Sequence, residues 1–282
     1  MKRKSNTAPI VVAVVSDLHS GSTVGLCPPI INLDDGGTYR AGPHQVWLWS
    51  QWKDFCKRAK KTAKKQGGKF IVIANGDLSE GNHHHTRAVI GAGNETLQMR
   101  IAEDNLGKLL EHADAAYFMR GTPAHVGGQS KLEEKIADNW TNVVRQSEAA
   151  ATWWHLRLDV NGTLFDVAHH GSVGRLPWTK SNALGKIATA AIMQAHESGQ
   201  RPANVVIRSH LHQYVDSGAN YKTIRVIGTP AWQLITGFVH RISPGSLADI
   251  GGLIFTCYPG GEYDCEVVRY QPDPDPVQEV TA

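Results

Sequence analysis

The sequence predicts an α/β protein, and three observations support this prediction. Short apolar runs, which are typical of buried strands, alternate with longer segments that have one apolar face, which is typical of helices. In the first half the order is strand, helix, strand, helix, strand, which favours a doubly wound sheet of parallel strands. Several strand candidates are followed directly by Asp or His, at the position where open α/β sheets place their ligands.

The first half of the chain contains strand candidates, helix candidates and one long loop. The strands are continuous apolar runs of the kind that parallel sheets bury on both faces, expected at 10–15, 69–74 and 115–119. The helices each have an apolar face and are expected at 44–66, 96–113 and 131–144. Residues 20–43 are rich in Gly, Pro, Asn and Asp, so they are expected to form a surface loop.

The second half is expected to begin with a β-hairpin. Two apolar runs, 152–160 and 163–168, are joined by Asn161-Gly162, which is a strong signal for a tight turn between antiparallel strands. The later elements are expected as a helix at 180–197, a strand at 204–207 and further hairpins up to Tyr270. With no internal repeat and no clear linker, the sequence predicts one domain at 10–270, after a flexible segment at 1–9 and before a disordered tail at 271–282.

Composition indicates an ordinary globular protein. The chain has 282 residues, 41% of them hydrophobic and 20% charged, so it can build a core without disulfides. The cysteines are scattered and form no Cys-x-x-Cys pair, which predicts reduced thiols and a cytoplasmic location: Cys27, Cys56, Cys257 and Cys265. No apolar run reaches the length of a membrane span, so no membrane partner is expected.

Charge leaves two interpretations open. The net charge of +3 is too small to indicate a nucleic-acid partner by itself. The first expected helix, however, carries a dense set of lysines between Lys53 and Lys65. These lysines form either a solvated helix face or a patch that attracts nucleic acid or phosphate.

Five segments of the chain end in groups that can bind a metal ion. They are Asp17 with His19, Asp77, Thr122 with His125, His169 with His170, and His210 with His212. Carboxylates mixed with imidazoles suit Mn, Fe or Zn. An aspartate that bridges two ions would make a two-metal site, which activates water and clamps phosphoester oxygens. The chain has no phosphate-binding loop of the Gly-x-x-x-x-Gly-Lys-Ser/Thr type that would suggest another chemistry.

The ordered set of motifs resembles the calcineurin-like metallophosphoesterase family. The matching residues are Asp17-Leu-His19, Gly76-Asp77, His169-His170 and Ser209-His-Leu-His212, in the order of that family and over about residues 10–212. The resemblance implies a metallophosphoesterase domain of two packed sheets flanked by helices. It also implies two divalent metal ions, with Mn expected first and Fe, Zn or Ni as alternatives. The implied activity is phosphoester hydrolysis, above all of phosphodiesters, with a nucleotide or a nucleic acid among the candidate substrates.

The family's ligands can be carried over by position. The resemblance implies that Asp17, His19 and His212 hold the first metal ion and that Asp77 bridges both ions. His210 and one histidine of the pair His169-His170 would hold the second ion, with His169 preferred because it comes first after the strand. Asp77 is therefore expected to act in catalysis as well as in metal binding.

One motif departs from the family pattern. Where the family has Gly-Asn-His, this chain has Gly121-Thr-Pro-Ala-His125, so the Asn ligand of the second metal is missing. We expect His125 to be an active-site residue with its role left open: it could supply the family's catalytic imidazole, or His125 or Thr122 could fill the vacant ligand position. The departure also supports an alternative function, a non-catalytic scaffold or binding protein that metal ions stabilise.

Residues outside the motifs add weaker expectations. Asn82-His-His-His85 could form a polar loop, contact phosphate or supply a ligand, and Arg120 and Arg175 could pair with phosphate. Trp232 and His240 could line a pocket. The sequence does not indicate the oligomeric state.

Overall fold

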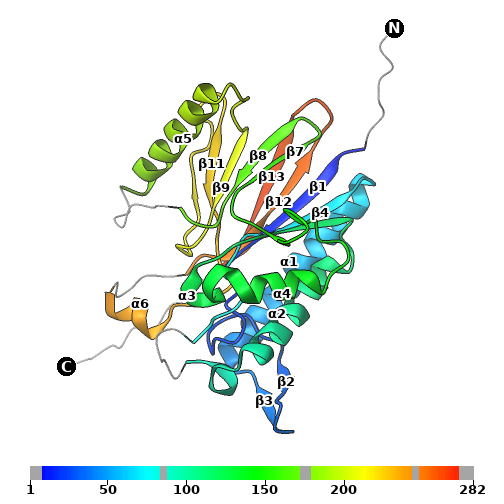
Figure 1. Ribbon diagram of the computed structural model, residues 1–282, viewed down its shortest axis with the longest axis vertical. Helices are drawn as coiled ribbons and strands as arrows, with labels where there is room; N and C mark the ends of the chain where they lie inside the picture. The colour runs from blue at the N-terminus through cyan, green and yellow to red at the C-terminus, as the bar shows by residue number, and fades with distance from the viewer. Residues whose placement is uncertain (1–7, 83–87, 172–178, 243–247, 273–282) are drawn as a thin grey trace, which may run out of the picture.

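Six strands form the first sheet, in the order β13-β12-β1-β4-β5-β6 (Figure 1). Their bounds are β1 Ile10–Val15, β4 Phe70–Ala74, β5 Ala115–Met119, β6 Thr152–Trp153, β12 Ile250–Cys257 and β13 Tyr263–Tyr270. Strands β1, β4, β5 and β6 run parallel, whereas β12 is antiparallel to β1 and to β13.

This computed structural model describes residues 8–82, 88–171, 179–242 and 248–272.

A second sheet has the strand order β10-β11-β9-β8-β7. Its strands are β7 Leu156–Val160, β8 Thr163–Val167, β9 Val205–Arg208, β10 Val215–Asp216 and β11 Arg225–Gly228. The three inner strands β8, β9 and β11 are parallel, and both edge strands are antiparallel to their neighbours. The carboxyl ends of β8 and β9 therefore lie at the same edge of this sheet.

The two sheets pack face to face around one layer of apolar side chains. On β1, Val12 and Val14 contact residues of the second sheet, whereas Val11, Ala13 and Val15 face the helices. Both faces of this strand are buried, which explains why its sequence is a continuous apolar run.

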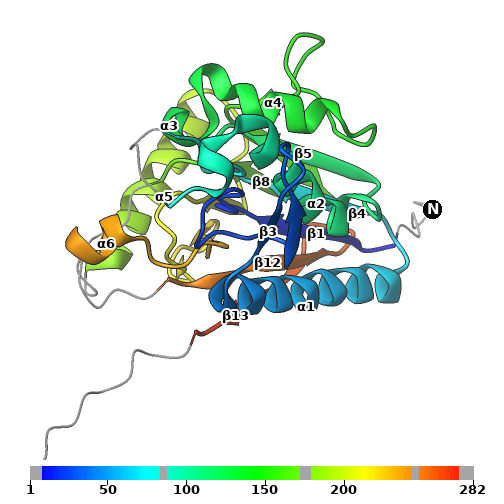
Figure 2. The same ribbon diagram turned by 90° about the horizontal axis from the view of Figure 1, so that it is seen from below.

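Helices cover the two outer faces. Helices α1 (Pro43–Gln66), α2 (Glu95–Leu110) and α4 (Lys131–Asp138) pack on the first sheet, and α5 (Lys180–Glu197) packs on the second (Figures 1 and 2). Two short helices, α3 (Pro123–Val126) and α6 (Gly237–Ile242), lie in connecting segments. Among the described residues, no helix is long and apolar enough to cross a membrane.

The segment expected as one long loop contains a small hairpin. Strands β2 (Ile30–Asn32) and β3 (Thr38–Arg40) pair antiparallel within it. Ile31 packs with Leu97 and Ile101 of α2, so this segment has a small apolar cluster of its own.

The fold class predicted from the sequence is confirmed: the protein is α/β, with two packed sheets flanked by helices. The expected doubly wound sheet was wrong in its layers, because helices cover one face of the first sheet and the second sheet covers the other. Asn161-Gly162 makes the predicted hairpin β7–β8, and that hairpin pairs with β9 instead of with the first sheet. Strand alternation with helices cannot show this, because it does not say which strands become neighbours.

Several boundaries differ from the prediction. The helix expected at 131–144 ends at Asp138, and the strand expected at 152–160 is interrupted between Trp153 and Leu156. Strand β11 was expected in a hairpin but pairs parallel with β9, whereas β12 and β13 do form one. The expected flexible start and most of the expected tail lie outside the described residues, and the single domain stays a prediction.

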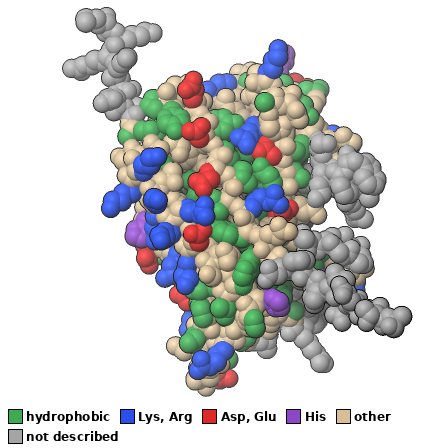
Figure 3. Space-filling view, turned by 180° about the vertical axis from the view of Figure 1, so that it is seen from behind, with side chains coloured by type: hydrophobic (Ala, Val, Ile, Leu, Met, Phe, Trp, Pro, Cys, Tyr) green, Lys and Arg blue, Asp and Glu red, His purple; other side chains and the backbone are tan. Residues whose placement is uncertain are grey.

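The lysines of α1 lie along an exposed helix face. Lys57, Lys61, Lys64 and Lys65 are exposed. The helix ends at Gln66, close in sequence to the amino end of β4, while Asp77 follows that strand's carboxyl end. Most of these lysines therefore lie toward the edge of the sheet opposite to Asp77. On the face seen in Figure 3, acidic and apolar side chains lie between the basic ones.

Replacing Phe165 tests the packing between the sheets. Its ring contacts Phe255 edge to face at 5.1 Å, and both side chains are fully buried. We expect Phe165→Ala to lower the free energy of unfolding by about 3–5 kcal/mol, because a cavity remains after the ring is removed. Urea denaturation measures this, with the exposed Met193→Ala on α5 as the control, expected to change stability by less than about 0.5 kcal/mol. Equal effects of the two substitutions would contradict a core at this place.

Candidate metal centre

The carboxyl ends of four strands place the predicted ligands at one edge of the sandwich. Asp17 follows β1 and Asp77 follows the parallel neighbour β4. His169 follows β8, and His210 follows its parallel neighbour β9, two residues before His212. Since parallel neighbours end at the same edge, each sheet brings its own ligands together, and sheet packing joins the two sets.

The backbone is left-handed at most of these residues. The φ angles are 52° at Asp17, 46° at His19, 52° at Asp77, 77° at His210 and 53° at His212. Such angles are uncommon for residues other than glycine and are typical of functional sites, where the surrounding structure compensates the strain. Among the described residues only two other non-glycine residues share this conformation, Ser130 and Asn161.

Glycines allow the loops to approach one another closely. Gly76 has a φ of 83°, and a Cβ atom there would lie 2.4 Å from Nδ1 of His169. A Cβ atom at Gly121 would lie 2.3 Å from Oδ1 of Asp77. Any larger residue at either position would push a predicted ligand away.

One cluster of three donors contains Asp17, His19 and His212. Nε2 of His19 lies 3.1 Å from Nε2 of His212 and 4.0 Å from Oδ1 of Asp17. Oδ1 of Asp17 lies 3.3 Å from Nε2 of His212. One carboxylate oxygen and two imidazole nitrogens thus face one another at distances that a divalent ion could bridge.

The Asp17 carboxylate is the strongest local indication of a metal ion. Its Oδ1 atom is buried and has no hydrogen-bond partner among the described residues. A buried carboxylate oxygen that accepts no hydrogen bond has lost its water, and here only the charge of the nearby histidines offsets that cost. The residues around it therefore fit a cation at this position.

A second cluster surrounds Asp77. Oδ2 of Asp77 lies 3.0 Å from Nε2 of His169 and 3.8 Å from Nδ1 of His210. Ligand atoms of Asp17, Asp77 and His169 also lie within 4.8 Å of one another, so the two clusters are adjacent. Asp77 lies where one carboxylate could reach ions in both clusters.

Neighbouring acceptors set the orientation of two imidazoles. Nδ1 of His19 lies 2.8 Å from Oε2 of Glu80, which also accepts a hydrogen bond from Nε2 of Gln233 at 2.9 Å. Nδ1 of His169 donates to the backbone carbonyl of Asn75 at 2.6 Å. With a proton held on Nδ1, Nε2 is the atom of each ring that faces its cluster, as in metal-binding histidines.

The charges of the site stabilise one another without a metal. Burial raises the pKa of Asp17 and of Asp77, but the nearby histidines outweigh it, so the pKa of Asp17 is lowered and that of Asp77 lies well below its usual value. Burial lowers the pKa of His169, but Asp77 and Asp17 outweigh it and raise the pKa to about 10. The metal-free site therefore holds an imidazolium between two carboxylates at neutral pH.

Thr122 and His125 make different contacts around Asp77. Thr122 donates its backbone N–H to Oδ1 of Asp77 at 2.6 Å and its hydroxyl to Oδ2 at 3.0 Å. His125 donates Nδ1–H to the carbonyl of Glu80 at 2.9 Å, and its ring meets that of His19 edge to face at 4.5 Å. Burial lowers the pKa of His125 to about 4, so the imidazole is neutral at pH 7.

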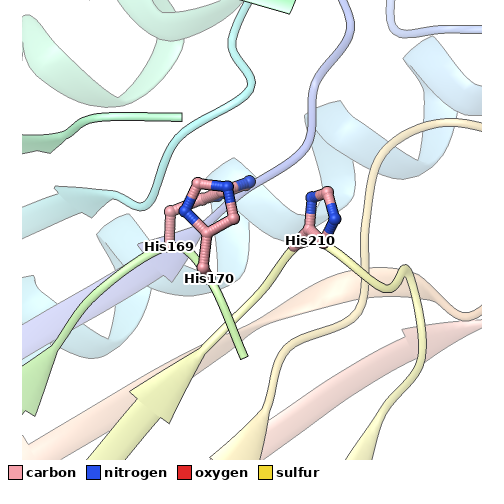
Figure 4. A group of neighbouring side chains, drawn as sticks. All are labelled: His169, His170 and His210. Carbon is pink, nitrogen blue, oxygen red and sulfur yellow. The ribbon is translucent and has the colours of Figure 1, made fainter. Parts of the chain in front are cut away.

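The structure brings all the predicted site residues together. His169 is buried, whereas His170 is exposed, and the rings of both gather with that of His210 (Figure 4). The ligand roles themselves stay predictions.

Sequence reasoning missed the residues that support these side chains. Glu80 lies three residues after Asp77, and this closeness in the sequence could have identified it as a residue of the site. Glu133 accepts the backbone N–H of Gly121 at 2.7 Å and that of Leu78 at 3.4 Å. The signal for Glu133 was a carboxylate on the buried face of α4. Burial, with the nearby charge of Asp77, raises the pKa of Glu133 to about 8.

Some weaker expectations are not met or fall outside the described residues. Arg120 pairs with Glu134 at 3.1 Å and lies over the ring of Trp154, so it supports the fold. Trp232 is fully buried against Trp52, so its expected place in a pocket was wrong. The predictions for 83–85 and Arg175 lie outside the described residues.

Comparison with known proteins gives matches only among solved structures. No protein-family model and no curated protein sequence matches the chain. Vacuolar Protein Sorting 29 from Cryptosporidium parvum matches with 8% identity and a TM-score of 0.45, over 94% of this chain and 100% of its own. A predicted phosphoesterase from Streptococcus pneumoniae matches with 11% identity and a TM-score of 0.33, over 93% and 99%. The sulfate thiohydrolase SoxB from Thermus thermophilus matches with 11% identity and a TM-score of 0.44, over 93% and 58%.

Similarity at this level carries no argument about the fold of this chain. The three proteins share the calcineurin-like metallophosphoesterase fold, which the motif series of this chain implies. Their TM-scores are all below 0.5. The fold class therefore rests on the strand order and packing of this chain, and the matches carry no argument about activity.

Metal binding should release protons. The pKa of His169 in the metal-free protein is about 10, so at pH 7 an ion must displace the proton from its Nε2. We expect the affinity for Mn²⁺ to rise as the pH is raised from 6 to 8. Calorimetric titration at pH 7 in two buffers of different ionisation enthalpy measures the released protons. Heats that do not depend on the buffer would contradict the expected displacement.

Glu80 should support the binding of the first ion. We expect Glu80→Gln to weaken metal affinity by about 10- to 100-fold, the range that follows from loss of the partner of a ligating histidine. Equilibrium dialysis with Zn²⁺ measures this, and the exposed Glu111→Gln is the matched control. An affinity unchanged in Glu80→Gln would show that Glu80 does not orient His19 for metal binding.

Proposed function

We propose that this protein is a metal-dependent phosphodiesterase that uses two divalent ions and a water nucleophile. The observation that carries the proposal is the pair of adjacent donor clusters that meet at Asp77, one of them with the unpaired buried oxygen of Asp17. Bound divalent ions would lower the pKa of a water molecule and neutralise charge on the phosphoester oxygens.

The proposed ligands divide between the clusters. Asp17, His19 and His212 hold one ion, Asp77 reaches both, and His169 and His210 hold the other. Mn²⁺ is the first candidate, with Fe, Zn or Ni as alternatives, because carboxylates and imidazoles together suit borderline metals.

The chain's own residues position these groups. Thr122 directs both of its donors to Asp77, and Glu133 holds the backbone of the two loops that carry Asp77 and Thr122. These contacts leave the Asp77 carboxylate little freedom to turn. A bridging carboxylate must keep one orientation, because a rotation would break its contact with one of the two ions.

His125 is proposed to act on the leaving group. It lies beside His19 and Asp77, at the edge of the first cluster. In the free protein the pKa of His125 is about 4, which disfavours the imidazolium form at pH 7. A bound phosphoester carries negative charge and would raise this pKa, so His125 would gain a proton when substrate arrives and could pass it to the departing oxygen.

A nucleotide or a nucleic acid remains the proposed class of substrate. The lysines of α1 do not strengthen the nucleic-acid alternative, because most of them lie toward the edge opposite to Asp77. Salt distinguishes a nucleic acid from a nucleotide. Each phosphate contact releases counterions, so the binding of a polymer falls steeply as the salt concentration rises.

A cytoplasmic location also stays a prediction.

Hydrolysis of bis-p-nitrophenyl phosphate and of p-nitrophenyl phosphate tests the proposal. The metal-free protein is reloaded with Mn²⁺, and Asp77→Asn is compared with Asp35→Asn, an exposed residue between β2 and β3. We expect diester turnover to fall at least about 100-fold in Asp77→Asn, because loss of a residue that only orients a metal ligand already costs about 10- to 100-fold. Asp35→Asn should keep wild-type activity.

The outcomes separate the proposed enzyme from the alternative scaffold. Diester turnover that depends on Asp77 and falls again in His125→Ala would support the two-metal phosphodiesterase and the role of His125. If the protein binds metal but hydrolyses neither ester, nor nucleotides, nor DNA, the non-catalytic scaffold would replace the phosphodiesterase as the proposed function.

A further inference from the structure

The missing Asn ligand of the second metal raises the question of which side chain takes its place. Thr122 occupies the matching position in the sequence, but its hydroxyl donates to Oδ2 of Asp77 at 3.0 Å. A neutral hydroxyl is also a weaker donor to a divalent ion than an imidazole or a carboxylate. The hydroxyl also lies 3.0 Å from Nδ1 of His210, but as the weaker ligand it leaves a neighbouring imidazole as the better candidate for the position of the amide.

His125 belongs to the first cluster. Its ring lies against His19, and the donors that group with it are His19 and Asp77. Its Nδ1 donates to the carbonyl of Glu80. His169 and His210 of the second cluster share no such group with His125 among the described residues.

His170 lies on the correct side. One ring nitrogen from each of His169, His170 and His210 lies within 4.8 Å of the other two. Ring centroids are 5.0 Å apart between His169 and His170 and 5.1 Å apart between His170 and His210. Figure 4 shows the three rings together at the ends of β8 and β9.

The backbone explains how two consecutive histidines reach one site. Successive side chains in a strand point to opposite faces, which would separate His169 from His170. Strand β8, however, ends at Val167, so both residues lie beyond it. Their rings are perpendicular, with the Nε2 atoms of His169 and His170 lying 3.5 Å and 3.4 Å from Oγ1 of Thr122.

We infer that His170 is the fourth protein ligand of the second metal ion and takes the place of the missing amide. The set is then Asp77, His169, His170 and His210. The inference rests on the proposed metal centre. Nitrogens bound to one ion at about 2.1 Å in tetrahedral geometry lie about 3.4 Å apart. The ring nitrogens lie within 4.8 Å of one another, so each pair would need to approach by no more than about 1.4 Å.

This ligand set makes the two metal positions unequal. The first has carboxylates from Asp17 and Asp77 with two imidazoles, whereas the second has one carboxylate and three imidazoles. Imidazole-rich sites suit Zn²⁺, Ni²⁺ or Fe²⁺, and carboxylate-rich sites suit Mn²⁺ better. The second position should therefore select Zn²⁺ over Mn²⁺ more strongly than the first.

Metal stoichiometry tests the assignment without any need for turnover. The metal-free protein is dialysed against Zn²⁺ of defined concentration, and bound Zn²⁺ is measured by atomic absorption. We expect two equivalents in the wild type. In His170→Ala we expect one equivalent with unchanged affinity and a second that is weakened at least about tenfold, since even outer-shell partners of a metal cost about 10- to 100-fold.

Matched variants complete the experiment. His112→Ala removes an exposed histidine away from the site and should bind as the wild type does. Adding Thr122→Asn to His170→Ala returns an amide to the family's position and should restore the second equivalent. Circular dichroism of each metal-free variant shows that it is folded.

Several results would overturn the inference. The wild type could bind a single equivalent of Zn²⁺. The His170→Ala protein could bind two equivalents with unchanged affinity, or could be folded and bind none. The double variant could fail to regain the second equivalent. If His170→Ala loses the second Zn²⁺ as expected but the wild type hydrolyses no phosphoester, the inference stands and the proposed phosphodiesterase fails.

Discussion

Two buried carboxylates determine how the rest of the site is built. Asp17 and Asp77 are 0% and 1% exposed and belong to the same group of donors. Two buried negative charges at this separation repel each other and have lost their water, so they persist only with positive charge beside them. Without a metal ion His169 supplies that charge, and with one the ion would take over. The site is thus held ready for cations by the folding of the chain.

The packing of the two sheets brings opposite charges into one place. The carboxylates come from the first sheet, at the ends of β1 and β4, and His169 comes from the second, at the end of β8. A chain of hydroxyl and amide groups joins the sheets behind them. Oγ1 of Thr229 lies 2.7 Å from Oγ of Ser16 and 2.7 Å from Oγ of Ser209, and Ser209 accepts from Asn75 at 2.6 Å. These hydrogen bonds tie the ends of the two sheets together beside the candidate ligands.

The motif that departs from the family pattern has a local physical explanation. Thr122 makes two hydrogen bonds to Asp77, so the loop positions that carboxylate. Pro123 and Ala124 begin the short helix α3, which brings His125 beside His19. The two parts of this segment therefore make different contacts, while His170 lies with His169 and His210.

The sequence by itself determined the α/β class, most of the elements and the identity of the candidate ligands. Apolar runs and helical faces are local patterns, and a donor placed directly after a strand is visible from chain order alone. Only the tertiary structure decided which strands belong to which sheet, that His170 joins His169 and His210, and that Glu80 and Glu133 support the loops. These features depend on contacts between residues far apart in the chain. Periodicity and spacing report only on neighbours along the chain, so they cannot reveal which loops meet when the sheets pack.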